Sequence, residues 1–155
     1  MPPRYQDIPA TKIPQAVSQD GKVSARVLAG ECLGVSAVIE TVISITYIHL
    51  TIHPGGSIIQ PIRAGENAMI YVFEGQIMAD ESTVKEGQLG ILTDGDEVSL
   101  RVPEDAKRVT QMLILAGDPI NEPIARYGPF VMNTDEEIRH AIIDYQNGTL
   151  TTEQE

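Results

Sequence analysis

Residues 53–75, HPGGSIIQPIRAGENAMIYVFEG, decide how the rest of this sequence is interpreted. The Pro-Gly-Gly near its start predicts a turn, because glycine adopts positive φ angles at little cost. A short strand over 57–62 and a longer apolar strand over 68–73 follow, with a second turn between them. A hairpin turn is then expected at Gly75. The stretch therefore predicts tightly connected antiparallel strands.

The remainder of the chain repeats this alternation of short strands and turns. Clear alternation of apolar and polar residues predicts strands over 23–29, 44–53 and 98–102, and a last long strand is expected over 108–116. In total we expect at least eight short strands, separated by glycine- or proline-containing turns. Such a sequence is typical of an all-β sandwich or barrel.

Both ends of the chain differ from this central part. Residues 1–19 contain four of the ten prolines and are expected to form an extended arm. We assign 20–128 to the β-barrel and 129–155 to a C-terminal segment with a polar tail. Within that segment a helix is predicted over 134–147, because Thr134 begins a capping box and apolar residues then recur at helical spacing.

Composition limits the classes of function. The 155 residues are 42% hydrophobic and 21% charged, which is typical of one globular domain. A formal net charge of −11 would repel a phosphate backbone, so direct binding to nucleic acid is not expected. No stretch has the length or apolarity of a signal peptide or membrane helix. The single cysteine, Cys32, is expected to be a buried structural thiol, and we expect a cytoplasmic protein.

Two of the three histidines, His49 and His53, fall on one face of the strand predicted over 44–53. Four residues along a strand span about 13 Å, too far for two imidazoles to hold one ion. We therefore expect this pair to lie on the solvent face without a metal.

The hairpin in 53–75 resembles the first half of a cupin barrel, whose strands carry a His-x-His pair and a Glu that bind a metal. Counting back from Gly75 places those positions at about Pro61, Arg63 and Ala68. The fourth ligand position of the cupin pattern falls near Glu97 or Val98. The resemblance therefore implies a cupin-type β-barrel (a double-stranded β-helix, or jelly roll) with one C-terminal helix, without the metal-binding residues and without a cofactor.

A second resemblance covers nearly the whole chain. The segment 115–138, LAGDPINEPIARYGPFVMNTDEEI, and the early segment 4–9, RYQDIP, are similar to the pirin family. Members of that family are bicupins with two barrels in tandem, and the metal-binding residues lie in the N-terminal barrel. The resemblance implies that this sequence corresponds to the C-terminal barrel. Family activities, quercetinase-type dioxygenation and iron-dependent transcriptional co-regulation, depend on the other barrel.

Three functions are open at this point. The first is a non-catalytic module that acts through assembly, as a homodimer or with a separate N-terminal pirin-type barrel, using apolar faces around 38–43. The second is a quercetinase-type dioxygenase or another small cupin enzyme. The third is a small-molecule-binding cupin without chemistry. For a ligand pocket in the barrel interior, the polar candidates are Gln60, Tyr71, Glu97 and Gln111.

Overall fold

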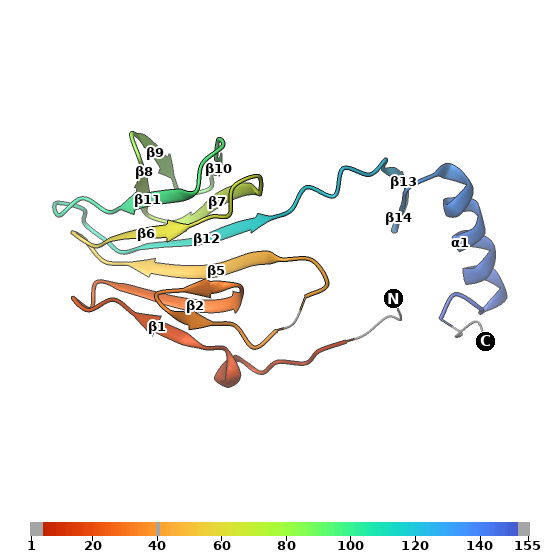
Figure 1. Cartoon of the computed structure of the whole chain (residues 1–155), viewed down its shortest axis with the longest axis horizontal. Coiled ribbons are helices and arrows are strands. Elements are labelled where there is room, and N and C mark those ends of the chain that lie inside the picture. Colours follow the sequence, from red (N-terminus) through yellow and green to blue (C-terminus); the bar gives the residue numbers. More distant parts are fainter. Residues whose placement is uncertain (1–4, 40, 152–155) are drawn as a thin grey trace. The chain divides into compact units, whose positions relative to one another are not determined.

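The computed structural model describes residues 5–39 and 41–151. It forms two compact units, one spanning Gln6–Pro119 and the other beginning at Ile120. The first unit contains two antiparallel sheets (Figure 1). Its larger sheet has the strand order β1 (Gln15–Val17), β2 (Val23–Ala29), β5 (Ile45–Ile52), β12 (Thr110–Gly117), β7 (Asn67–Glu74) and β10 (Leu89–Ile91).

The smaller sheet has the order β6 (Ser57–Pro61), β11 (Glu97–Arg101), β8 (Gln76–Ala79) and β9 (Ser82–Lys85). A separate small hairpin joins β3 (Glu31–Cys32) to β4 (Val35–Ser36). Consecutive elements exchange between the sheets, as in β5 to β6 and β7 to β8, so the two sheets enclose one core between them.

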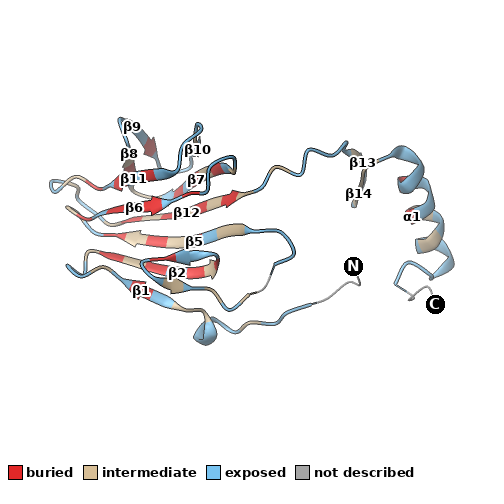
Figure 2. Ribbon diagram, viewed as in Figure 1, coloured by how far each residue is buried: buried red, intermediate tan, exposed pale blue. Residues whose placement is uncertain are grey.

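The core follows from the alternation of side chains along each strand. Strand β12 alternates buried and half-buried residues over its whole length, and β6 and β11 alternate exposed and buried ones (Figure 2). Successive side chains of a strand point to opposite faces, so apolar residues at every second position make one buried face. Fully buried side chains from both sheets meet there: Val23, Val27, Ile48, Leu50, Ile52, Ile70, Val72, Ile77, Leu100, Met112 and Ile114.

Strand β12 holds the larger sheet together. It pairs along its length with β5 on one side and with β7 on the other, so that Ile114 lies opposite both Ile48 and Ile70. Nothing else in the sheet order connects β1, β2 and β5 to β7 and β10.

The turn between β7 and β8 depends on Gly75. Its φ is +81°, and a Cβ added there would lie 2.7 Å from the Val109 carbonyl oxygen and 2.8 Å from Thr110 Oγ1. Glycine is required both for the left-handed backbone and for this close approach. The hairpin turn predicted at this position is confirmed.

The second unit contains a hairpin of β13 (Ala125–Tyr127) and β14 (Phe130–Met132), followed by α1 (Asp135–Asn147). Thr134 Oγ1 accepts a hydrogen bond from the Glu137 amide, and the Glu137 carboxylate accepts one from the Thr134 amide. Gly148 ends the helix in the left-handed conformation. The predicted helix and its capping box are therefore confirmed, as is an all-β architecture with one C-terminal helix.

Several local predictions differ from the structure. Residues 38–43, expected on apolar strands, lie in a loop, apart from residue 40, which is outside the described residues. The N-terminal arm contains a 3-10 turn (Ala10–Lys12) and the edge strand β1. The compact barrel unit ends at Pro119 rather than at 128, since β13 and β14 pair with each other. In the part of the chain that is described, no helix has the length and apolarity to span a membrane.

Candidate functional site

In a cupin barrel the metal-binding side chains point into the interior, so we compared the residues expected at those positions with the residues that face the interior here. On β6 the alternation turns Gln60 inward, and Ile62, just beyond the strand, is buried as well. Pro61 and Arg63 are exposed. Their placement at metal-facing positions was therefore wrong by one residue, because a shift of one residue along a strand moves a side chain to the opposite face.

The two other expected positions do face the core. Ala68 at the start of β7 is buried, and Val98 on β11 is buried directly opposite Gln60. Gln60, Ile62, Ala68 and Val98 together supply one amide and three aliphatic side chains. These residues do not fit a metal set of imidazoles and carboxylates. Over residues 5–39 and 41–151, no group of three or more His, Cys, Asp or Glu side chains is arranged to hold an ion.

Gln60 is the one polar candidate that the structure places in the interior. Its side-chain Nε2 donates to the backbone carbonyls of Glu31 (3.0 Å) and Pro61 (3.1 Å). These two acceptors fix the orientation of the amide, because a flipped amide would bring Oε1 against two carbonyl oxygens. Oε1 itself is buried without a hydrogen-bond partner.

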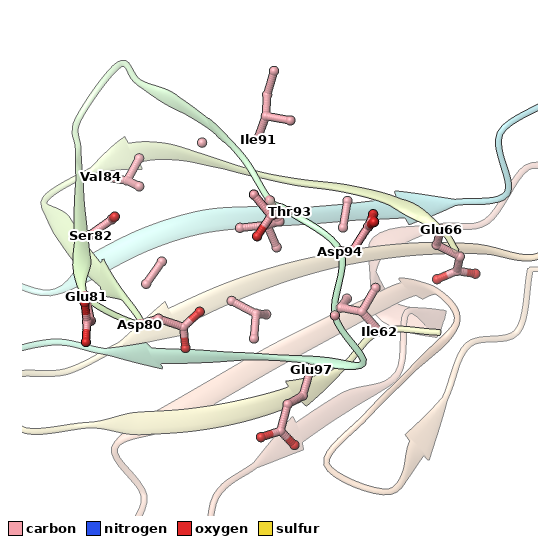
Figure 3. Close-up of a pocket in the computed structure, with 16 residues that line it drawn as sticks. Ile62, Glu66, Asp80, Glu81, Ser82, Val84, Ile91, Thr93, Asp94 and Glu97 are labelled. Carbon is pink, nitrogen blue, oxygen red and sulfur yellow. The ribbon is translucent and has the colours of Figure 1, made fainter. Parts of the chain in front are cut away.

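A cavity of about 570 Å³ opens between the two sheets at the end of the barrel near the start of β7. Its floor is apolar, with Ile62, Ala68, Val84 and Val98 among its residues. Its rim carries hydroxyls and carboxylates and no basic side chain (Figure 3). The carboxylates come from three loops and the start of β11: Glu66, Asp80, Glu81, Asp94 and Glu97.

The predicted candidate Glu97 belongs to this rim and not to the interior. On β11 the inward positions are Val98 and Leu100, so Glu97 is turned to the outer side of the strand and is exposed. Of the four polar candidates, only Glu97 contributes to this cavity.

Beside the cavity, Arg63 links two acidic residues from different parts of the barrel. Its guanidinium lies 2.5 Å from Asp118 Oδ2 and 3.2 Å from Glu66 Oε1. The hydrogen bond to Asp118 and the negative charge of that carboxylate raise the pKa of Arg63, and the hydrogen bond to Glu66 adds to this effect. The Glu66 side chain is only 4% exposed, but its pair with Arg63 lies within one loop. The contact between this loop and the end of β12 is the exposed ion pair of Arg63 and Asp118, and exposed ion pairs contribute little to stability. Sequence reasoning missed this cluster, since its residues are up to 55 positions apart.

Tyr71 and Gln111 are on the outer face of the larger sheet, so their predicted interior placement is wrong. On β7 the inward residues are Ala68, Ile70 and Val72, and on β12 they are Thr110, Met112 and the following alternate residues. Both alternating faces of β7 and β12 are largely apolar, so the alternation alone did not show that Tyr71 and Gln111 point outward.

Gln111 connects two side chains on that outer face. Its Nε2 donates to a carboxylate oxygen of Glu74, and its Oε1 lies 3.2 Å from His49 Nε2. Since an ionised carboxylate only accepts, the amide orientation is fixed and His49 Nε2 must carry the proton. The His49 ring also packs against Phe73, with centroids 5.4 Å apart. His49 is therefore half-buried and not a free solvent-face residue, whereas His53 is exposed as expected.

Cys32 fits the expectation of a structural thiol. It is buried on β3, and this burial raises the pKa of its thiol to about 11. Such a thiol is protonated at neutral pH and is a poor nucleophile.

Comparison with known proteins agrees with this architecture. The family described as the Pirin C-terminal cupin domain matches residues 47–151, more than half of the chain. The chain belongs to the pirin family. Pirin from Homo sapiens is 34% identical over 149 residues, which are 94% of this chain and 50% of that protein. The pirin-like protein of Solanum lycopersicum is 38% identical over the same shares of both chains.

A solved structure confirms the cupin fold of this pirin-family barrel. Quercetin 2,3-dioxygenase from Acinetobacter baumannii superposes with a TM-score of 0.85 at 32% identity, over 95% of this chain and 50% of that one. The chain thus spans about half the length of the pirin relatives it matches.

Proposed function

We propose that this pirin-family barrel is a non-catalytic module that acts by assembly with another protein domain, with a second copy of the chain as its partner. One observation carries the non-catalytic part. The residues that face the interior at or next to the expected ligand positions are Gln60, Ile62, Ala68 and Val98. Three of these four side chains have no atom that can bind a metal or transfer a proton.

Assembly is supported by the relatives. Each matched pirin is about twice as long as the region it shares with this chain, so the homologous region works there beside a second segment of similar length.

The non-catalytic part is tested by metal content and turnover. Protein purified without a histidine tag would be offered iron(II) anaerobically and analysed by plasma mass spectrometry, with the Acinetobacter baumannii dioxygenase as positive control. We expect a metal-to-protein ratio near zero and no oxidation of quercetin. A ratio near one, or quercetin turnover above that of buffer, would contradict the proposal and favour a dioxygenase.

A second candidate function, small-molecule binding without chemistry, is favoured by the cavity at the barrel end. An apolar floor beside the exposed carboxylates of Asp80, Glu81 and Asp94, with no basic side chain among the lining residues, suits an organic cation with an apolar body. A thermal-shift series of aliphatic amines, with the matching carboxylic acids as controls, tests this function. We expect amines alone to raise the melting temperature, and Asp94→Asn to reduce that rise.

A further inference from the structure

The outer face of the larger sheet carries a continuous apolar surface across β5, β12, β7 and β10. Leu113 lies opposite Tyr71, which lies opposite Leu89, and Leu115 lies between Tyr47 and Met69. Exposure is greatest at the edge, where Ile91 is 78% exposed. We call this surface the outer-face band, and it consists of Tyr47, Met69, Tyr71, Phe73, Leu89, Ile91, Leu113 and Leu115.

Charge is almost absent from this face. Among the residues of the six strands, only Arg26 and Glu74 are acidic or basic apart from His49, although the chain as a whole is 21% charged with a net charge of −11. Three of the chain's seven aromatic residues, Tyr47, Tyr71 and Phe73, are in the band. Protein interfaces are enriched in aromatic residues and methionine and are depleted of charge at their centres.

We propose that the outer-face band is the surface on which a second copy of this chain binds, sheet face to sheet face. This inference rests on the proposed function and names the surface through which assembly occurs. The four strands of the band have 27 residues. With about 3.3 Å per residue and about 4.8 Å between strands, they cover roughly 430 Å². Two such faces bury about 860 Å² in total, an area typical of weak or transient interfaces.

This face carries one positive and one negative side chain. That pattern favours a second copy of the chain over a partner whose surface carries charge of one sign only. Arg26 lies on β2 and Glu74 at the end of β7, on opposite sides of the central strands β5 and β12. Within the described residues the Arg26 side chain makes no hydrogen bond or ion pair. A two-fold symmetric pair uses the same surface on both copies, so each Arg26 can face the Glu74 of the other copy. The face is therefore self-complementary in charge as well as apolar.

Sedimentation and light scattering on the whole chain test the surface. We expect a dimer for the natural sequence and at least a tenfold weaker association for Ile91→Lys and for Tyr71→Lys. Ile59→Lys is the matched control, because Ile59 is 59% exposed but lies on β6 in the other sheet. Its association should equal that of the natural protein.

The outcomes separate this inference from the proposed function. If the natural protein is a dimer and Ile91→Lys and Tyr71→Lys do not weaken it, the outer-face band is not the interface. The proposed self-assembly would then still hold. A monomeric natural protein overturns the proposed self-assembly. A monomer whose melting temperature falls in Ile91→Lys but not in Ile59→Lys shows instead that residues of the same chain cover the band, which also overturns the second copy as its occupant.

A charge exchange tests the orientation of the pair. Arg26→Glu and Glu74→Arg should each weaken the dimer, and the double variant should restore it. A double variant as weak as either single one would overturn the contact between Arg26 and Glu74. Melting temperatures of all three variants check that each one is folded.

Discussion

The Gln60 amide is fixed by the backbone carbonyl of Glu31, to which its Nε2 donates at 3.0 Å. This contact joins β6 of the smaller sheet to the β3–β4 hairpin. It also leaves Gln60 Oε1 buried without a partner. A polar residue thus connects a hairpin to the barrel at an inward position of β6, one residue from the position to which the cupin resemblance assigned the first ligand of the lost metal site.

Gln60→Glu should destabilise the barrel in a pH-dependent way. An ionised carboxylate there would be buried against two carbonyl oxygens, so its pKa would be raised in the folded state. Stability would then be lost as pH rises, and we expect a loss of about 3 kcal/mol or more at pH 8. Urea unfolding at pH 5 and pH 8 measures this difference. Gln60→Leu is the control and should show no dependence on pH.

Gly75→Ala and Gly87→Ala separate backbone strain from steric clash. Both glycines have positive φ, but a Cβ at position 87 meets nothing within 4 Å, whereas at position 75 it meets the backbone of Val109. We expect Gly87→Ala to cost about 1–2 kcal/mol and Gly75→Ala about 3–4 kcal/mol. Denaturant midpoints of the two variants measure this, and equal losses would contradict it.

The Cys32 thiol should make stability decrease at high pH. Burial raises its pKa from 9.0 to about 11, so the folded state keeps a proton that the unfolded chain releases. This contribution is fully present below about pH 8 and falls by about 2 kcal/mol by pH 10.5. We expect the stability difference between the natural protein and Cys32→Ala to shrink by that amount. A constant difference across this range would show that the thiol is not desolvated.

Thr134→Ala should loosen α1 without affecting the barrel. The substitution removes the hydroxyl that accepts from the Glu137 amide, and loss of such a cap costs about 1 kcal/mol. We expect faster hydrogen exchange in the first turn of α1 and unchanged exchange in β12. Thr151→Ala, in the chain beyond the helix, is the control.

The strands could be predicted from the sequence because their two faces differ so clearly. Apolar residues at every second position mark β2, β5, β7, β11 and β12, and glycines mark the turns between them. The capping box marked α1 in the same direct way. Short hairpins were missed, since β3–β4 and β13–β14 have two or three residues a strand, too few to show a period.

The candidate site was harder to predict for a geometric reason. Assigning Gln111 to the interior required knowing which alternating face of β12 is buried, and both faces of that strand are apolar, with Leu113 and Leu115 outside and Met112 and Ile114 inside. On β6 the ligand positions were found by counting back from Gly75, and the result was wrong by one residue. The exposed residues Pro61 and Arg63 were therefore assigned to the inward face. Side chains that meet across sheets, such as Arg63 and Asp118, leave no trace in local sequence.

The central place of β12 has a consequence for how the protein folds during synthesis. Its residues 110–117 are the last of the barrel to be made, yet they pair with both β5 and β7. Until they leave the ribosome, those two strands each present an unpaired edge, and such edges are sites of aggregation. Closure of the barrel must wait for contacts about 60 residues apart in sequence, which slows folding. The nascent chain is therefore most exposed to misassociation just before β12 emerges.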